Sequence, residues 1–376
     1  MSKAISDSDS VARTIVTRSD SSAGRDLVET AKVLSEWLTG RVPDASRVDV
    51  VEMGRPSASG GSSETYFVKA DLASNGEVRR ENYVLRARPR EFRMFLRENF
   101  DEQYRLLTHL HAETDVPVPA IPYYEPDPAV LGDPFWLMEW VAGEVPPDNP
   151  PYHVAGYVAD ASLEQRRSIW QSGLQAASRI PLADVARMPQ IVPLKPGQSG
   201  MEENLGHWTE AMHWAREGDD HPLLDQAIEW LWANMPARRE TALSWGDCRI
   251  GNMIFRDYRC AAIIDWDTIT LAGPQLDLAH WLVMEDYFIT GFGLAPLAGI
   301  GRREEIIAKW QGFTGLEADQ LGWHEVLAMF RLEINCVRGF RFLPDDIRKT
   351  LYFSDGTTVM SRTLARTFER VSGQRI

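Results

Sequence analysis

Cysteine is scarce in this sequence of 376 residues, which contains only Cys248, Cys260 and Cys336. These are too few and too far apart for a disulfide framework, so we expect a reducing compartment, by default the cytoplasm. Basic residues are also in deficit, because 54 acidic residues outnumber 40 basic ones and the formal charge is -14. We therefore expect no nucleic-acid partner and no general attraction to anionic membranes.

Long apolar runs are missing as well. The most apolar long run, residues 292–300, contains glycine and proline and is much shorter than the roughly 20 residues that a spanning helix needs. Residues 1–24 are rich in serine and aspartate, lack the apolar core of a secretory signal, and are predicted to form a disordered tail. The overall composition, 44% hydrophobic and 25% charged, is that of a globular protein whose length suits two lobes.

The first predicted lobe, residues 25–142, is rich in β-strands. Apolar residues at helical spacing predict a helix over 27–38, which Gly40 ends. Clusters of Ser/Gly and Asn/Gly separate three β-rich runs, which predicts an antiparallel meander. The remaining predicted elements of this lobe are strands over 48–53, 65–70 and 83–87, a helix over 100–110 and a buried strand over 135–141.

The second predicted lobe, residues 143–376, is mostly helical. Apolar periodicity predicts helices over 163–180, 202–215 and 223–235, with one β-like interruption over 253–265. The predicted class is therefore α+β, with a small β-rich lobe followed by a large helical one.

The β-like interruption contains the strongest functional signal in the chain. Asp247 precedes Asn252 by five positions, and two short apolar strands joined by a polar loop then lead to Asp265. Because two such strands form an antiparallel hairpin, Asn252 and Asp265 should lie beside each other. A site with only a few oxygen ligands from the protein suits Mg²⁺ that also binds phosphate oxygens. Asp247 would face the same metal site.

This arrangement resembles the kinase catalytic loop, in which an Asp orients the substrate hydroxyl and an Asn and a later Asp bind Mg²⁺. More narrowly, three segments are similar to the aminoglycoside phosphotransferase-like family of small-molecule kinases, in the branch of the kinase domains fused to certain acyl-CoA dehydrogenases. The segments are Trp245-Gly246-Asp247 through Asn252, Ile264-Asp265-Trp266-Asp267 and Leu276-Asp277-Leu278-Ala279. The resemblance runs from about Val50 to at least Leu282 and implies a protein-kinase-like bilobal fold.

The resemblance also implies a role for each polar residue of these segments. Asp247 would be the catalytic residue, and Asn252 and Asp265 the metal ligands. Asp277 would support the catalytic loop, although an Asp in this position is also an ordinary helix N-cap. Trp245 would shape the loop where many family members have His, and Asp267 would be either a second metal carboxylate or a solvated turn residue.

The predicted nucleotide site draws on the first lobe. Ser59, Gly60, Gly61 and Ser62 lie between the first two strands, where main-chain N–H groups and hydroxyls could close over phosphates, although such a segment is also simply a flexible turn. Arg86 falls where kinases place the strand Lys and would meet the α- and β-phosphates. Its acidic partner would be Glu102 in one register, whereas the preferred register places Gln103 there.

The segment Met138-Glu139-Trp140-Val141 resembles the hinge between kinase lobes. Main-chain groups of Glu139 and Val141 would bind adenine and Met138 would line its pocket, the alternative being a plain buried strand. The histidines show no metal-ligand pattern, so no zinc site is expected, and Cys248 is expected to be a small packing residue.

These residues predict an ATP- and Mg²⁺-dependent phosphotransferase whose partner is a small-molecule hydroxyl acceptor. The resemblance points to a hydroxylated acyl thioester, an amino sugar or a choline-like alcohol without choosing among them. A nucleotide-binding pseudokinase is the alternative, motivated by Trp245, Gln103 and the absence of the usual strand Lys. A plain interaction module is a third candidate with no positive feature behind it.

Overall fold

The computed structural model describes residues 25–56, 64–89 and 94–375. The predicted tail at 1–24 lies outside the described residues. Strands gather in the early part of the chain and helices in the later part, so the predicted α+β class is confirmed. Within the described residues no helix is long and apolar enough to cross a membrane.

The chain divides into two compact units, which alternate once along the sequence. The first consists of Met1–Arg93 and Pro119–Trp140, and the second of Met94–Val118 and Val141–Ile376. The division after Trp140 lies close to the predicted lobe boundary near residue 142. Met94–Val118, which contains the helix predicted in the first lobe, belongs instead to the second unit.

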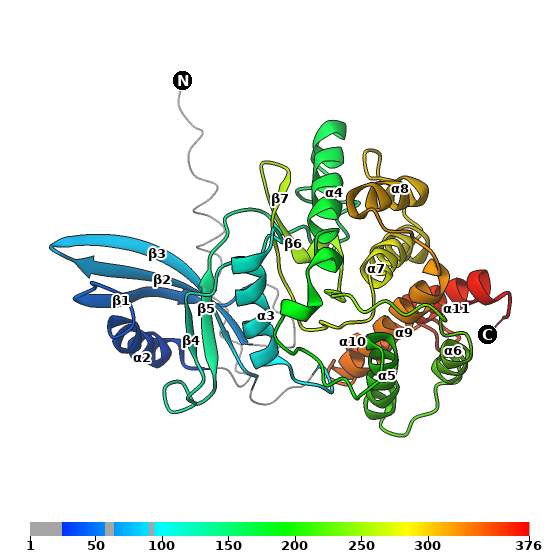
Figure 1. Ribbon diagram of the computed structural model, residues 1–376, viewed down its shortest axis with the longest axis horizontal. Coiled ribbons are helices and arrows are strands. Elements are labelled where there is room, and N and C mark those ends of the chain that lie inside the picture. Colours follow the sequence, from blue (N-terminus) through cyan, green and yellow to red (C-terminus); the bar gives the residue numbers. More distant parts are fainter. Residues whose placement is uncertain (1–24, 57–63, 90–93, 376) are drawn as a thin grey trace. The chain divides into compact units, whose positions relative to one another are not determined.

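The first unit contains an antiparallel sheet whose described strands follow the order β1-β2-β3-β5-β4 (Figure 1). The turn between β2 and β3 is tight, because Asn75 and Gly76 both have positive φ and Ser74 pairs directly with Glu77. The meander predicted from the Asn/Gly cluster is therefore confirmed. The strands are β1 (Arg47–Gly54), β2 (Glu64–Ser74), β3 (Glu77–Ala87), β4 (Tyr123–Glu125) and β5 (Phe135–Glu139).

One helix, α2 (Leu27–Thr39), packs on this sheet. The carboxylate of Asp26 caps it by accepting hydrogen bonds from the N–H groups of Val28 and Glu29, and Gly40 ends it as predicted. Its buried residues Leu34 and Leu38 join a core that includes alternate residues of β2 and β3. The other face of β3 is thereby left uncovered by α2.

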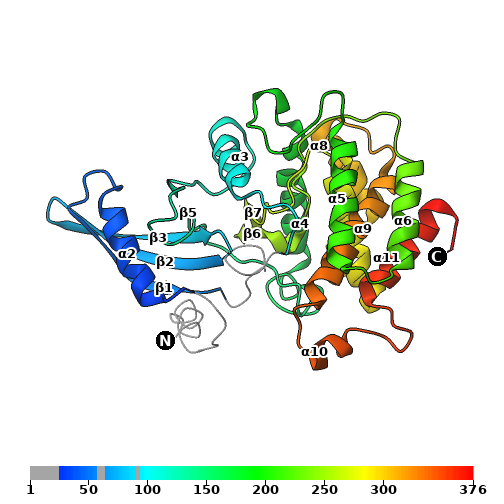
Figure 2. The ribbon, with the colours of Figure 1, turned by 90° about the horizontal axis from the view of Figure 1, so that it is seen from below.

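The second unit is mostly helical, and α5, α6 and α9 run side by side in it (Figure 2). Its short segments include η4 (Ile250–Asn252) and a π-helical turn, η5 (Tyr287–Gly291). Its helices are α3 (Phe100–Glu113), α4 (Leu163–Ala177), η2 (Ile180–Leu182), η3 (Val185–Arg187), α5 (Gly200–Arg216), α6 (Pro222–Ala233), α7 (Gln275–Asp286), α8 (Arg303–Thr314), α9 (Leu321–Phe340), α10 (Asp345–Thr350) and α11 (Val359–Ser372).

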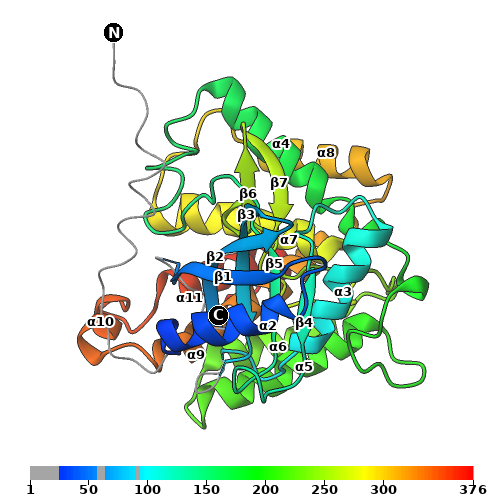
Figure 3. The ribbon, with the colours of Figure 1, turned by 90° about the vertical axis from the view of Figure 1, so that its left-hand side faces the viewer.

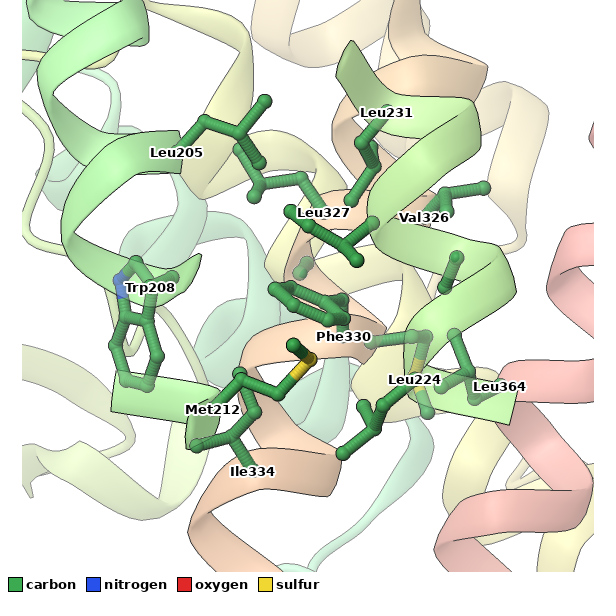
Figure 4. Packing of buried hydrophobic residues seen from close by; sticks show 14 of the residues in the cluster. Leu205, Trp208, Met212, Leu224, Leu231, Val326, Leu327, Phe330, Ile334 and Leu364 are labelled. Atoms are coloured by element: carbon green, nitrogen blue, oxygen red, sulfur yellow. The ribbon is translucent and has the colours of Figure 1, made fainter. Parts of the chain in front are cut away.

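The largest apolar core of this unit surrounds α9. Phe330 lies at its centre, in contact with a cluster that includes Leu205 and Met212 of α5 and Leu224 of α6 (Figure 4). Phe330 is fully buried, and truncating such a side chain to alanine typically costs about 3 to 5 kcal/mol. Helix α9 is thus the fixed element against which α5, α6, α7 and α11 pack.

The predicted hairpin is present as β6 (Met253–Arg256) and β7 (Arg259–Ile263), which lie beside α4 (Figure 3). Asp257 and Tyr258 form its two-residue turn, both with positive φ. The register pairs Met253 with Ile263, and the N–H of Ile264 donates to the carbonyl of Asn252 over 3.0 Å. Asn252 and Asp265 consequently stand at the same end of the hairpin.

Candidate active site

The loop that precedes β6 is held by a carboxylate from α7. Both oxygens of Asp277 accept main-chain hydrogen bonds, from the N–H of Trp245 and the N–H of Gly246, each over 2.8 Å. The alternative that Asp277 caps its own helix is wrong, because α7 begins at Gln275 with Pro274 in the capping position. Burial raises the pKa of Asp277, although the two N–H groups and nearby His280 oppose the shift.

Asp247 lies at the centre of this loop with partners for both of its oxygens. Oδ2 accepts a hydrogen bond from Nδ2 of Asn252 over 2.8 Å, and Oδ1 accepts one from Nε of Arg249 over 3.1 Å. Burial by itself would raise the pKa of Asp247, but the charge of Arg249 and the contacts with His280 and Asn252 outweigh it and lower that pKa. The carboxylate is therefore ionised at neutral pH.

Two residues at this carboxylate were not singled out from the sequence. Nε2 of His280 lies 2.9 Å from Oδ1 of Asp247. The contact lies outside hydrogen-bond geometry, since neither ring nitrogen of the buried His280 has a hydrogen-bond partner in the described chain. The available signal was its position one helical turn after Asp277, which places both side chains on one face of α7. Arg249 also forms an ion pair with Asp148. The sequence feature that could have identified Arg249 is the presence of a basic residue within the loop.

Trp245 connects the loop to the far end of the hairpin. Its indole Nε1 donates a hydrogen bond of 2.6 Å to the main-chain carbonyl of Asp265, and its ring is buried 5.9 Å from that of Trp266. An indole can only donate, and here its single N–H is used. The structure thus brings Trp245, Asp247, Asn252 and Asp265 together in the second unit.

Asp267 is buried, so the alternative of a solvated turn residue is wrong. Its Oδ1 accepts a hydrogen bond from Nε2 of Gln103 over 2.7 Å, and its carbonyl accepts one from Nδ2 of Asn99 over 2.9 Å. Gln103 belongs to α3, so these bonds fasten α3 to the segment that follows β7. Glu102, the other candidate partner for Arg86, forms an ion pair with Arg105 at 3.0 Å.

The candidate nucleotide residues that are described lie in, or just after, the inner strands β3 and β5 of the first unit's sheet. Arg86 is in β3, opposite Trp136 of β5, with its guanidinium carbon 6.0 Å from that ring. Met138 and Glu139 end β5, and Val141 is the first residue of the second unit's long segment. Ser59, Gly60, Gly61 and Ser62 lie outside the described residues.

The oxygen ligands of the predicted metal site are few. No group of three or more His, Cys, Asp or Glu side chains in the described ranges could hold a metal ion. Asn252 and Asp265 alone would make an incomplete site, of the kind that phosphate oxygens complete. Because Nδ2 of Asn252 is occupied by Asp247, its Oδ1 is the atom left for a cation.

The fold is that of kinase-like phosphotransferases. A protein of Ralstonia eutropha provisionally assigned as an aminoglycoside phosphotransferase superposes with a TM-score of 0.64 at 19% identity, over 92% of this chain and 99% of that one. The streptomycin–ATP complex of APH(2″)-IIa superposes with a TM-score of 0.52 at 15% identity, over 85% and 95%.

The sequence is also similar to that of a known family. The APH model, which describes the phosphotransferase enzyme family, matches residues 54–316, and the chain belongs to this family. The prediction of a phosphotransferase enzyme is thereby confirmed.

Curated relatives include much longer proteins. "Probable acyl-CoA dehydrogenase IBR3" of Arabidopsis thaliana is 27% identical over 71% of this chain and 31% of its own length. Acyl-CoA dehydrogenase family member 11 of Homo sapiens is 24% identical over 72% and 34%. The chain thus spans about a third of the length of these relatives, and the predicted resemblance to this branch is confirmed.

Proposed function

We propose that the protein transfers the γ-phosphate of ATP to a hydroxyl of a small molecule and that Asp247 acts on that hydroxyl. The observation that supports this most directly is the Asp247 carboxylate, ionised and held on both oxygens in a loop that Asp277 fixes. Membership of the phosphotransferase enzyme family gives the reaction class.

In this mechanism Asp247 accepts a hydrogen bond from the acceptor hydroxyl and directs its oxygen at the γ-phosphorus. The bond between that oxygen and phosphorus forms as the bond from phosphorus to the β–γ bridging oxygen breaks, so that ADP leaves and the hydroxyl proton passes to the Asp247 carboxylate. Arg249 and His280 flank Oδ1, and Asn252 binds Oδ2, so the carboxylate is positioned before the acceptor arrives.

The residues present fit a magnesium ion bound together with the nucleotide. Asn252 and Asp265 would hold it, since an amide oxygen and a carboxylate at one end of the hairpin are hard donors. Bound there, Mg²⁺ would neutralise charge on the phosphates. Trp245, which donates to the carbonyl of Asp265, keeps this end of the hairpin fastened to the catalytic loop.

ATP is proposed to bind through residues of the first unit and through Val141. Arg86 would hold the α- and β-phosphates, Ser59, Gly60, Gly61 and Ser62 would close over them, and Met138, Glu139 and Val141 would surround adenine. APH(2″)-IIa, which binds ATP in its complex with streptomycin, shares the fold and supports ATP as the donor.

The acceptor is proposed to be a hydroxylated acyl thioester, with an amino sugar as the competing class. The names of the curated relatives favour an acyl-CoA-related acceptor, whereas the solved structures include aminoglycoside phosphotransferases. The alternative is a nucleotide-binding pseudokinase, and ATP consumption with an acceptor separates it from the enzyme. Trp245 and Gln103, which motivate this alternative, each make a hydrogen bond near the Asp247 loop.

Asp247→Asn tests the proposal. We expect turnover to fall by about 10² to 10⁴ while ATP affinity changes little, because Asp247 acts on the acceptor. Asp257→Asn is the matched control, since it makes the same chemical change at an exposed turn whose positive φ asparagine tolerates. ATP consumption would be measured with hydroxyacyl thioesters and aminoglycosides, and full activity in Asp247→Asn would remove Asp247 from the mechanism.

A further inference from the structure

A buried arginine of α9 reaches the catalytic loop from behind. Arg331 is 2% exposed, and burial lowers its pKa to about 10, so it still carries its charge at neutral pH. The negative charges of Asp277 and Asp247 oppose this shift, and in the part of the chain that the structure describes Nε and Nη1 have no hydrogen-bond partner. A buried guanidinium is costly unless polar partners compensate it, so the group to which Arg331 donates is informative.

That contact is with the residue before Asp247. Nη2 of Arg331 donates a hydrogen bond of 3.1 Å to the main-chain carbonyl of Gly246, across 85 positions of sequence. The guanidinium carbon also lies 4.9 Å from the centre of the Trp208 ring on α5, which holds the side chain in place.

Gly246 has no room for a side chain. Its φ is +91°, and an added Cβ would lie 2.2 Å from the carbonyl oxygen of Thr268 and 2.8 Å from Nη2 of Arg331. Its N–H is bound by Asp277 and its carbonyl by Arg331, so α7 and α9 hold the residue from opposite ends. The carbonyl belongs to the peptide bond that leads into Asp247, and fixing its plane fixes where the Asp247 side chain starts.

We propose that Arg331 is a positioning residue of the active site, which orients Asp247 by holding the Gly246–Asp247 peptide. The inference rests on the proposed function for its kinetic consequence alone, because the orientation of the loop is a property of the protein without substrate. If packing were the only role, an unbranched apolar side chain of similar length would replace it without loss.

Three variants on α9 separate these roles. Arg331→Met keeps most of the length and removes the donors, whereas Arg331→Lys keeps the charge and a donating ammonium group without the planar guanidinium. Arg338→Met is the matched control, because Arg338 also stacks on a tryptophan, 3.9 Å from the ring centre of Trp214, and pairs with Glu217 at 2.8 Å.

The first readout is amide hydrogen exchange of the full chain. We expect exchange in residues 245–252 to accelerate by about ten- to a hundredfold in Arg331→Met, the range for losing a hydrogen bond to a charged group, and by less in Arg331→Lys. Arg338→Met should leave this segment at the wild-type rate. Unchanged exchange of the loop in Arg331→Met would overturn the proposal, and so would an equal acceleration in Arg338→Met.

The second readout is kinetic. With an acceptor that the wild type phosphorylates, kcat should fall by about ten- to a hundredfold in Arg331→Met and recover in part in Arg331→Lys, with KM for ATP within about threefold. A rise in KM at constant kcat would contradict a positioning role. If the wild type turns over no acceptor, the proposed function fails while hydrogen exchange still decides the role of Arg331.

Discussion

Arg86 occupies the half-buried face of β3, together with Val84, opposite the face that α2 covers. We predict that Arg86→Met weakens ATP binding or turnover by about ten- to a hundredfold, because a charge-assisted contact of about 1.5 to 3 kcal/mol is lost while most of the apolar stem remains. Nucleotide titration by calorimetry would measure the affinity, and steady-state assays the turnover.

Arg80 supplies the control for this experiment on the same strand. It is exposed and forms an ion pair with Asp71 at 2.7 Å, so Arg80→Met makes the same substitution away from the proposed phosphates. Equal behaviour of the two variants would refute the assignment of Arg86. Arg88, which strand alternation places on the same face, would then be the next candidate.

The carboxylates that follow β7 are separated by two positions and have different surroundings. We predict that Asp265→Ala weakens Mg²⁺-dependent nucleotide binding more than Asp267→Ala does, because Asp265 stands at the hairpin end beside Asn252 whereas Asp267 binds Gln103 of α3. Titrations with and without Mg²⁺ would separate metal-dependent from metal-independent losses. Equal metal-dependent losses would mean two metal carboxylates, and a larger loss at Asp267 would exclude Asp265 as the main metal ligand.

At the scale of elements, sequence periodicity predicted the parts whose apolar residues face one core. It predicted α2, α3 and the β6–β7 hairpin, and with the hairpin the shared end of Asn252 and Asp265. It missed the outer halves of β2 and β3, which extend to Ser74 and begin at Glu77, because Leu72 is the one large apolar residue of β2 beyond Ala70 and residues 77–80 of β3 are exposed without apolar alternation.

The distant contacts of the loop that contains Asp247 were beyond prediction for a different reason. His280 and Arg331 act on residues 33 and 85 positions away, and local patterns carry no information about which distant side chains will meet. From the sequence, Asp277 could equally be an ordinary helix N-cap. The structure excludes this role, because α7 already begins at Gln275. Gln103 stands where an acidic partner of Arg86 was the alternative, and its side chain binds Asp267 instead.

At the scale of the whole molecule, the stability of the protein should depend on a buried histidine of α9. His324 of α9 is 1% exposed, and burial lowers its pKa to about 3. Below about pH 6.5 the unfolded chain binds a proton there that the folded chain does not, so the free energy of unfolding falls as the pH falls. From pH 7 to pH 5 we predict a loss of roughly 2 kcal/mol from this residue.

Urea unfolding at both pH values would measure this loss, with His324→Leu as the variant that cannot titrate. The difference in unfolding free energy between pH 7 and pH 5 should shrink in His324→Leu. His213→Leu, a change at an exposed position, should leave that difference as in the wild type. An unchanged pH dependence in His324→Leu would show that the folded chain protonates His324 readily.

The turn at Asn75 and Gly76 and the three cysteines together make the chain suitable for site-specific labelling. Burial raises the pKa of all three thiols, that of Cys260 to about 12, so few thiolates are available to a maleimide at neutral pH. Glu77, the exposed first residue of β3, is adjacent to a turn where a Cβ on Gly76 would meet no described atom within 4 Å. A fluorophore could therefore be attached to the first unit at Glu77→Cys with the native cysteines left in place.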